Sequence, residues 1–187
     1  MQFTLSALVA SAIFGSSIAV NVVIYPNSAV CDGSDGTGLE CSNVAALTCC
    51  HNNGGDIYSS KCSGLDTTGV PDQCVIATGA GPGVAYCTTS LEVDSGASII
   101  CLDPGSSPAA TGGFWVDLSS KKRFRRGSEV QCTKSVQPNK ALFGDRSFRI
   151  NYDVPANITD YLLGLIKTDP SLSKEIPGDV QQYEVTN

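Results

Sequence analysis

Residues 41–62 read CSNVAALTCCHNNGGDIYSSKC and decide how this chain is built, because they hold four of its nine cysteines. Two of the four, Cys49 and Cys50, are adjacent. Adjacent cysteines seldom bond to each other, since a disulfide suits Cα atoms about 5.5–6 Å apart. We therefore expect Cys49 and Cys50 to reach different partners and to tie two parts of the chain together.

Eight of the nine cysteines lie between Cys31 and Cys101. This density is typical of a secreted protein held together by disulfides, and each bridge stabilises the fold by about 2–4 kcal/mol. Eight cysteines allow about a hundred connectivities, so the spacing leaves the pairing open. The cysteines predicted to form bridges are Cys31, Cys41, Cys49, Cys50, Cys62, Cys74, Cys87 and Cys101.

The ninth cysteine, Cys132, stands apart from the others. If the first eight pair among themselves, Cys132 is free or joins a second molecule in a disulfide-linked dimer. If the chain is cut before it, Cys132 could instead tie two fragments together, and one of the eight would lose its partner. A metal site is not expected, because the chain has no C-x-x-C pair and His51 is its only histidine. No cofactor is predicted.

The first nineteen residues have the features of a signal peptide. They carry no charge, and their apolar run is interrupted by serines and is shorter than the ~20 residues a membrane span needs. Ser17 and Ala19 place small residues at both positions that signal peptidase reads. We predict a signal peptide over residues 1–19, a mature chain beginning at Val20, and a secreted, extracellular product without a membrane span.

The charges argue against nucleic acid as a partner. The net charge is −6, and residues 20–120 carry ten acidic side chains against Lys61 alone. Affinity for phosphate comes from lysine and arginine contacts, which this acidic region lacks.

Short strands separated by glycine and proline are predicted over most of the chain. Val20–Tyr25 is β-branched and predicts a strand, whereas Asn43–Cys50 is expected to be a short helix capped by Ser42. Four further strands are predicted at Gln73–Thr78, Val84–Thr89, Ser98–Leu102 and Phe114–Leu118.

In the tail, apolar and polar residues first alternate, as in a strand, and then follow a helical spacing. Ser147–Val154 predicts a half-buried strand, and Asn157 is expected to cap a helix that runs to about Lys167. Ile158, Tyr161, Leu162, Leu165 and Ile166 fall on one face of that helix, which should therefore pack on the sheet. Gln181–Val185 is expected to form a last strand.

These patterns indicate an α+β fold: a small disulfide-stapled β-rich region with a C-terminal strand–helix unit packed on it. The expected organisation is a cysteine-rich β-rich region over 20–120, an exposed basic loop over 121–126, and a strand–helix tail over 127–187. We expect the tail to pack on 20–120 as one domain.

Residues 121–126, KKRFRR, form a basic run with three interpretations. It could be a solvated loop that pairs with the acidic region. It could be a kexin-type processing site, with Arg123, Arg125 and Arg126 at the dibasic positions. It could also be an anchor for anionic lipid or a polyanionic sugar.

No catalytic residue stands out. His51 is expected to lie in a turn, there is no G-x-S-x-G elbow, and the acidic residues stand in no signature, although a carboxylate pair of a hydrolase remains an alternative. For binding, the best candidates are Trp115 and Phe114, because an exposed aromatic can stack on a sugar or fill a partner's pocket. The alternative is that they lie on opposite faces of one strand, with at least one in the core. Asn157 begins the only N-glycosylation sequon.

An uncharged leader, dense cysteines, an acidic glycine-rich body and an internal dibasic site together resemble the small cysteine-rich secreted proteins of fungi, among them effectors and kexin-processed killer toxins. The resemblance implies a non-enzymatic protein that acts by binding an extracellular partner, a protein or a cell-wall glycan. A carbohydrate-binding protein and a protease inhibitor are the alternatives.

Overall fold

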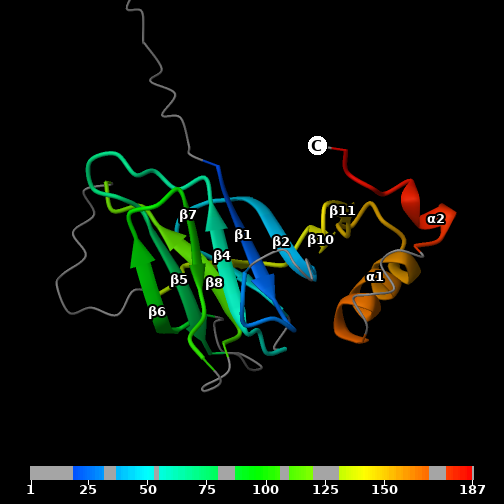
Figure 1. Ribbon diagram of the computed structural model, residues 1–187, viewed down its shortest axis with the longest axis horizontal. Helices are drawn as coiled ribbons and strands as arrows, with labels where there is room; N and C mark the ends of the chain where they lie inside the picture. The colour runs from blue at the N-terminus through cyan, green and yellow to red at the C-terminus, as the bar shows by residue number, and fades with distance from the viewer. Residues whose placement is uncertain are drawn as a thin grey trace, which may run out of the picture.

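The computed structural model describes residues 19–31, 37–52, 55–79, 87–105, 110–119, 131–168 and 176–186. Two β-sheets pack on each other, and a helical tail lies beside one end of them (Figure 1). The predicted α+β class, a disulfide-stapled β-rich region with a C-terminal strand–helix unit, is confirmed. Two predicted segments lie outside the described residues: the signal peptide up to residue 18 and the basic run over 121–126.

The first sheet has six strands in the order β11-β10-β2-β1-β4-β7, and all neighbours are antiparallel. Its strands are β1 (Val20–Tyr25), β2 (Thr37–Val44), β4 (Ser59–Ser63), β7 (Ile99–Leu102), β10 (Lys140–Phe143) and β11 (Arg146–Arg149).

The second sheet has five strands in the order β6-β5-β8-β3-β9, with β3 and β9 parallel and the other pairs antiparallel. Segments far apart in sequence meet here, and the chain after residue 127 adds β9 to this sheet and β10 and β11 to the first. Its strands are β3 (Thr48–His51), β5 (Gln73–Thr78), β6 (Thr89–Ser95), β8 (Gly112–Val116) and β9 (Lys134–Val136).

The main core lies between the sheets, where alternate residues of β1 meet the inner face of β8. Val20, Val22 and Ile24 are fully buried there. Gly113 of β8 allows the close approach, since a Cβ at this position would overlap the Ser60 hydroxyl and lie 3.3 Å from Val22 Cγ1. The absence of a side chain at one position of β8 therefore decides how closely the sheets can pack.

Four disulfides staple this arrangement, and Cys132 keeps a free thiol. The adjacent cysteines do reach different partners, as predicted. Successive side chains of a strand point to opposite faces, so Cys50 lies in the core between the sheets and Cys49 lies in a smaller cluster on the outer face of the second sheet. The bridges are Cys31–Cys101, Cys41–Cys50, Cys49–Cys87 and Cys62–Cys74.

The helix expected over Asn43–Cys50 is wrong. This stretch is the end of β2, a turn at Ala46–Leu47, and β3. Leu47 has a positive φ of 59°, because its N–H bonds to Trp115 O on one side and its carbonyl accepts from Thr133 N on the other. Pairing to two distant strands outweighs the helix propensity of the local sequence.

Among the other predicted strands, Gln73–Thr78 is confirmed as β5, Ser98–Leu102 as β7, and Phe114–Leu118 as β8 with earlier bounds. Half of the strand expected over Val84–Thr89 lies outside the described residues, and in the other half only Thr89 belongs to a strand, as the first residue of β6. The last strand, expected over Gln181–Val185, is wrong: Gln181 ends a short helix, α2 (Gly178–Gln181), a turn follows it, and Glu184 forms an isolated bridge to Phe148.

The tail strand is shorter than predicted. β11 ends at Arg149, and Asn151–Val154 turns back on itself through a bond from Val154 N to Asn151 O. In the predicted strand Tyr152 and Phe148 would lie on the same face, but Phe148 is fully buried and Tyr152 is 95% exposed.

The predicted amphipathic helix is confirmed as α1 (Ala156–Thr168), which lies beside β10 (Figure 1). Ile158, Leu162, Leu165 and Ile166 form its buried face, whereas Tyr161, predicted on the same face, is 37% exposed. The Asn27 side chain, from the segment after β1, donates to Ile166 O and so satisfies a carbonyl in the last turn.

Asn157 does not cap the helix. It is an exposed residue of the first turn, because α1 already begins at Ala156. Capping therefore does not compete with the predicted glycan at this position.

Candidate functional site

A β-bulge near the end of β2 is the most distinctive local feature of the first sheet. Val20 pairs with Val44, but Val22 pairs with Cys41, so β2 has one more residue than β1 in this interval. Asn43 takes up the extra length with a positive φ of 56°. Bulges re-aim side chains and are frequent beside functional sites.

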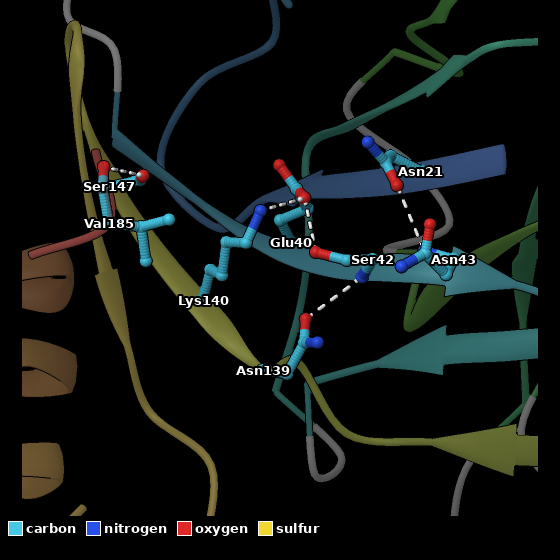
Figure 2. A network of polar contacts seen from close by, with 8 residues as sticks. All are labelled: Asn21, Glu40, Ser42, Asn43, Asn139, Lys140, Ser147 and Val185. Carbon is cyan, nitrogen blue, oxygen red and sulfur yellow. Dashed lines mark hydrogen bonds and ion pairs between the residues drawn. The ribbon is translucent and has the colours of Figure 1, made fainter. Parts of the chain in front are cut away.

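Two asparagine side chains accept hydrogen bonds from backbone N–H groups of β2 at the bulge (Figure 2). Asn43 N–H donates to Asn21 Oδ1 at 3.0 Å, and Ser42 N–H donates to Asn139 Oδ1 at 2.9 Å. Asn139 N–H in turn donates to Glu40 O at 2.9 Å. Strands β1 and β2 and the segment before β10 therefore hold the bulge in one conformation.

A charged pair extends this network, as Figure 2 shows. Lys140 Nζ lies 3.0 Å from Glu40 Oε1, and the same oxygen accepts from Ser42 Oγ at 2.5 Å. Both charged side chains are partly buried, at 23% and 12% exposed, so they are less screened than a fully exposed pair. The pair ties β10, from the tail, to β2. Figure 2 also shows Ser147 Oγ donating to Val185 O at 3.4 Å, which holds the C-terminal segment against β11.

A groove of about 350 Å³ opens beside the bulge, between the end of β2 and β9. The Cys41–Cys50 disulfide joins β2 to β3 at its wall. Its lining surface is mostly apolar, although side chains with amide, hydroxyl and ammonium groups also contribute to it. Such a lining suits a ligand that buries apolar surface and makes a few hydrogen bonds. The lining residues are Cys41, Ser42, Asn43, Val44, Ala45, Thr48, Lys134, Val136, Gln137 and Asn139.

Strand β9, which borders the groove, is the edge of the second sheet. Its three side chains are exposed, including Val136 at 38%. An edge strand offers backbone groups to which an extended segment of another chain can add.

The aromatic candidates lie in the interior. Phe114 is fully buried on the outer face of the second sheet, and Trp115 is 5% exposed in the core between the sheets. Trp115 Nε1 donates to Val44 O at 2.7 Å, so the indole holds the end of β2 from the core side. Stacking on a sugar needs an exposed ring face, and neither residue offers one. The two do lie on opposite faces of one strand, and both are buried.

His51 is not in a turn as expected. It is the last residue of β3, pairs with Gly112, and is 5% exposed beside a small cavity that α1 closes. Burial lowers the pKa of this histidine below its usual range, because a charged imidazolium would lose its hydration. His51 is therefore neutral at physiological pH.

Asp66 and Asp72 have pKa values shifted in opposite directions. Burial raises the pKa of Asp72, whereas hydrogen bonds from Thr68 lower the pKa of the exposed Asp66. Asp72 Oδ2 accepts from Asp66 N at 2.9 Å, and Asp72 N donates back to Asp66 O at 2.9 Å. These reciprocal bonds close the loop before β5, and local hydrogen bonding of this kind is the ordinary role of aspartate in turns.

The structure places the other predicted sites as follows. Cys132 is partly buried against the outer face of the second sheet, with Cys49 and Cys87 nearby. Arg123, Arg125 and Arg126 lie outside the described residues. Within the described ranges, no helix is both long and apolar enough to span a membrane.

Sequence reasoning missed the bulge and the groove. The Asn21, Glu40, Ser42 and Asn139 side chains are ordinary polar residues in the sequence, and no spacing links them. The only local signal is Asn43, since asparagine tolerates the left-handed backbone better than most residues.

Comparison with known proteins gives a family but no characterised relative. Residues 21–139 match the family model ARB_05566_N, described as an N-terminal domain. No curated protein and no solved structure matches the chain. The matched region holds all four disulfides, Cys132 and every residue of the groove, and it covers more than half of the sequence. This chain therefore belongs to the ARB_05566_N family.

Proposed function

We propose that this is a secreted, non-enzymatic protein of fungal effector or toxin type, which binds an extracellular protein at the groove between β2 and β9. The observation that carries the proposal is the groove itself, set at a hydrogen-bonded bulge and bordered by an edge strand.

The groove is pre-organised. Cys41–Cys50 joins the strands on its wall, Asn21 and Asn139 hold the bulge, and the Trp115 indole bonds to Val44 O from the core side. A contact surface that is rigid before binding loses less entropy when a partner docks. A small protein can bind a partner specifically through such a surface.

The chemistry of the groove suits an extended peptide segment. Strand β9 can add a partner strand through its backbone, while the side-chain amide of Asn43 can bind a peptide group. Val136 offers an exposed apolar contact on the same border.

Secretion is supported by the disulfides, and the predicted start of the mature chain coincides with the start of β1. Four bridges persist in an oxidising compartment and are rare in the cytosol. Strand β1 begins at Val20, the predicted first residue of the mature chain, and that residue is fully buried.

Binding of a cell-wall glycan is the second candidate. Trp115 does not support it, but Tyr152 is 95% exposed, and Tyr58 and Tyr161 are 49% and 37% exposed. Exposed tyrosine rings can stack on sugars while their hydroxyls stay in water.

The experiment measures binding of fluorescently labelled protein, residues 20–187, to intact target cells and to isolated chitin and glucan. Val136→Asp places a charge on the groove border, and Val93→Asp, at a comparably exposed position on β6, is the matched control. We expect saturable binding to cells that is weakened at least about tenfold by Val136→Asp, as for a buried contact at an interface centre. Val93→Asp should bind as the wild type does.

Protease treatment of the cells separates the two candidates. A protein partner is lost on treatment, whereas a glycan partner survives it and also retains the protein on chitin or glucan. Equal binding by the wild type and Val136→Asp would show that the groove is not the contact surface.

A further inference from the structure

Three sulfur atoms meet on the outer face of the second sheet. The Sγ atoms of Cys49, Cys87 and Cys132 all lie within 4.8 Å of one another. Cys49 and Cys87 are joined in a disulfide, and Cys132 is a free thiol. Since two of the three sulfurs are already bonded to each other, the arrangement is one of a nucleophile beside a disulfide rather than three ligands for a metal.

We propose that this cluster is an internal thiol–disulfide exchange site, in which Cys49 is bridged to Cys87 or to Cys132. The Cys132 thiol gives its proton to water and its thiolate attacks Cys49 Sγ. The Cys49–Cys87 bond breaks, the new Cys49–Cys132 bond forms, and Cys87 leaves as a thiolate that takes up a proton. One disulfide and one thiol are present before and after, so no oxidant or reductant is consumed.

Backbone positions decide that Cys49 is the shared partner. Cys49 is fully buried in β3, between β8 and β9, and has little freedom to move. Its two alternative partners lie at element ends: Cys87 precedes β6, and Cys132 precedes β9. Thr133 N already bonds to Leu47 O at 2.8 Å, which holds the Cys132 segment beside β3.

Cys87 also has an unusual backbone conformation. Its φ of 54° places a residue with a side chain in the left-handed region, which residues other than glycine and asparagine seldom adopt. Gly112 lies directly against this disulfide. A Cβ added at Gly112 would lie 2.8 Å from Cys49 Sγ and 2.6 Å from Cys87 Sγ. The Cys49–Cys87 bridge therefore leaves no room for a side chain at Gly112.

In the resting structure the exchange is slow. Burial raises the pKa of the Cys132 thiol to about 12, so little of it is thiolate at neutral pH. Exchange should therefore need alkaline conditions or a local opening at the start of β9.

Exchange would move a covalent link from one part of the fold to another. The Cys49–Cys87 bridge anchors the connection between β5 and β6, whereas a Cys49–Cys132 bridge would anchor the start of β9, beside the groove. If the chain were cut within 121–126, only the second bridge would join the two pieces covalently. The exchange does not depend on the proposed binding function.

The first test replaces the leaving group. In Cys87→Ser, Cys49 has only Cys132 as a neighbouring thiol, and we expect four disulfides and no free thiol. The control is Cys101→Ser, which frees Cys31, a residue outside this cluster. It should retain three disulfides and two free thiols, and thus weigh two hydrogens more than a chain with four bridges. Two free thiols in folded Cys87→Ser would overturn the proposal.

The second test uses the wild-type chain and does not depend on the folding of a variant. Oxidised protein is incubated in mildly alkaline buffer without denaturant, quenched in acid, labelled with a maleimide and mapped by mass spectrometry. We expect a label on Cys132 at the start, and later a label on Cys87 together with a peptide linked through Cys49 and Cys132. A label that stays on Cys132 alone, with Cys49–Cys87 intact throughout, would also overturn it.

Discussion

We expect Gly112→Ala to destabilise the fold. Among the described glycines with a negative φ, it should be the most costly glycine-to-alanine substitution. A Cβ at Gly112 would lie 2.5 Å from Cys50 O, 2.6 Å from Cys87 Sγ and 2.8 Å from Cys49 Sγ. Distances under 3.0 Å are too short for a stable contact. None of the three atoms can rotate away, since one belongs to the backbone of β3 and two to a disulfide.

The expected cost follows from this geometry. Adding a methyl group to a packed core costs about 1–3 kcal/mol, and the immobile neighbours place Gly112→Ala at the upper end, about 3 kcal/mol. Gly164→Ala is the matched control, because Gly164 lies inside α1 with nothing within 4 Å of an added Cβ. There the alanine should stabilise the helix by about 0.5–1 kcal/mol.

Denaturation in urea, followed by the fluorescence of Trp115, measures both changes. Trp115 is the only tryptophan and is 5% exposed, so its emission reports loss of the core. A double-mutant cycle locates the clash: in a Cys49→Ala, Cys87→Ala background, the cost of Gly112→Ala should fall by about 1 kcal/mol or more. The reasoning would be refuted if Gly112→Ala had the same free energy of unfolding as the wild type. It would also be refuted if Gly112→Ala lowered that free energy by the same amount with and without the Cys49–Cys87 bridge.

Two further predictions concern the bridges and the histidine. Replacing Cys31 and Cys101 with alanine should destabilise the protein more than replacing Cys41 and Cys50. The sequence separations are 70 and 9 residues, which correspond to about 4.4 and about 2.6 kcal/mol of loop entropy; the opposite order in urea denaturation would contradict this account. For His51, whose pKa burial lowers in the folded state, the unfolded chain binds the proton more readily, so stability is present above pH ~6.5 and is lost as the pH falls below it. His51→Gln should flatten that part of the stability–pH curve, and a curve identical to the wild type's would show that another group is responsible.

Predictions that depended on short-range pattern succeeded where the element is strongly periodic or β-branched. Val20–Tyr25 and Gln73–Thr78 have the predicted bounds, and α1 begins one residue before its predicted cap and ends one residue after Lys167. Alternation and helical period report which face an element buries, and that information is local.

Predictions failed where distant contacts outweigh local preference. Residues 43–50 favour a helix by composition, but Leu47 is bonded to β8 and to the segment before β9, and Cys50 is bridged to Cys41. Alternation across Ser147–Val154 likewise continues past Arg149, where the strand ends and the chain turns toward α1. In both places the chain follows pairings that a window of neighbouring residues does not contain.

The sequence by itself determined that this protein depends on disulfides, that its adjacent cysteines must diverge, and that strands precede an amphipathic helix, because cysteine density and hydrophobic period are properties of the chain alone. Only the tertiary structure decided which cysteines pair, that Trp115 is buried, that a groove opens beside the bulge of β2, and that Cys132 lies against the Cys49–Cys87 bridge. Each of these joins residues tens of positions apart. Their proximity results from strand register and sheet packing, which no local pattern in the sequence encodes.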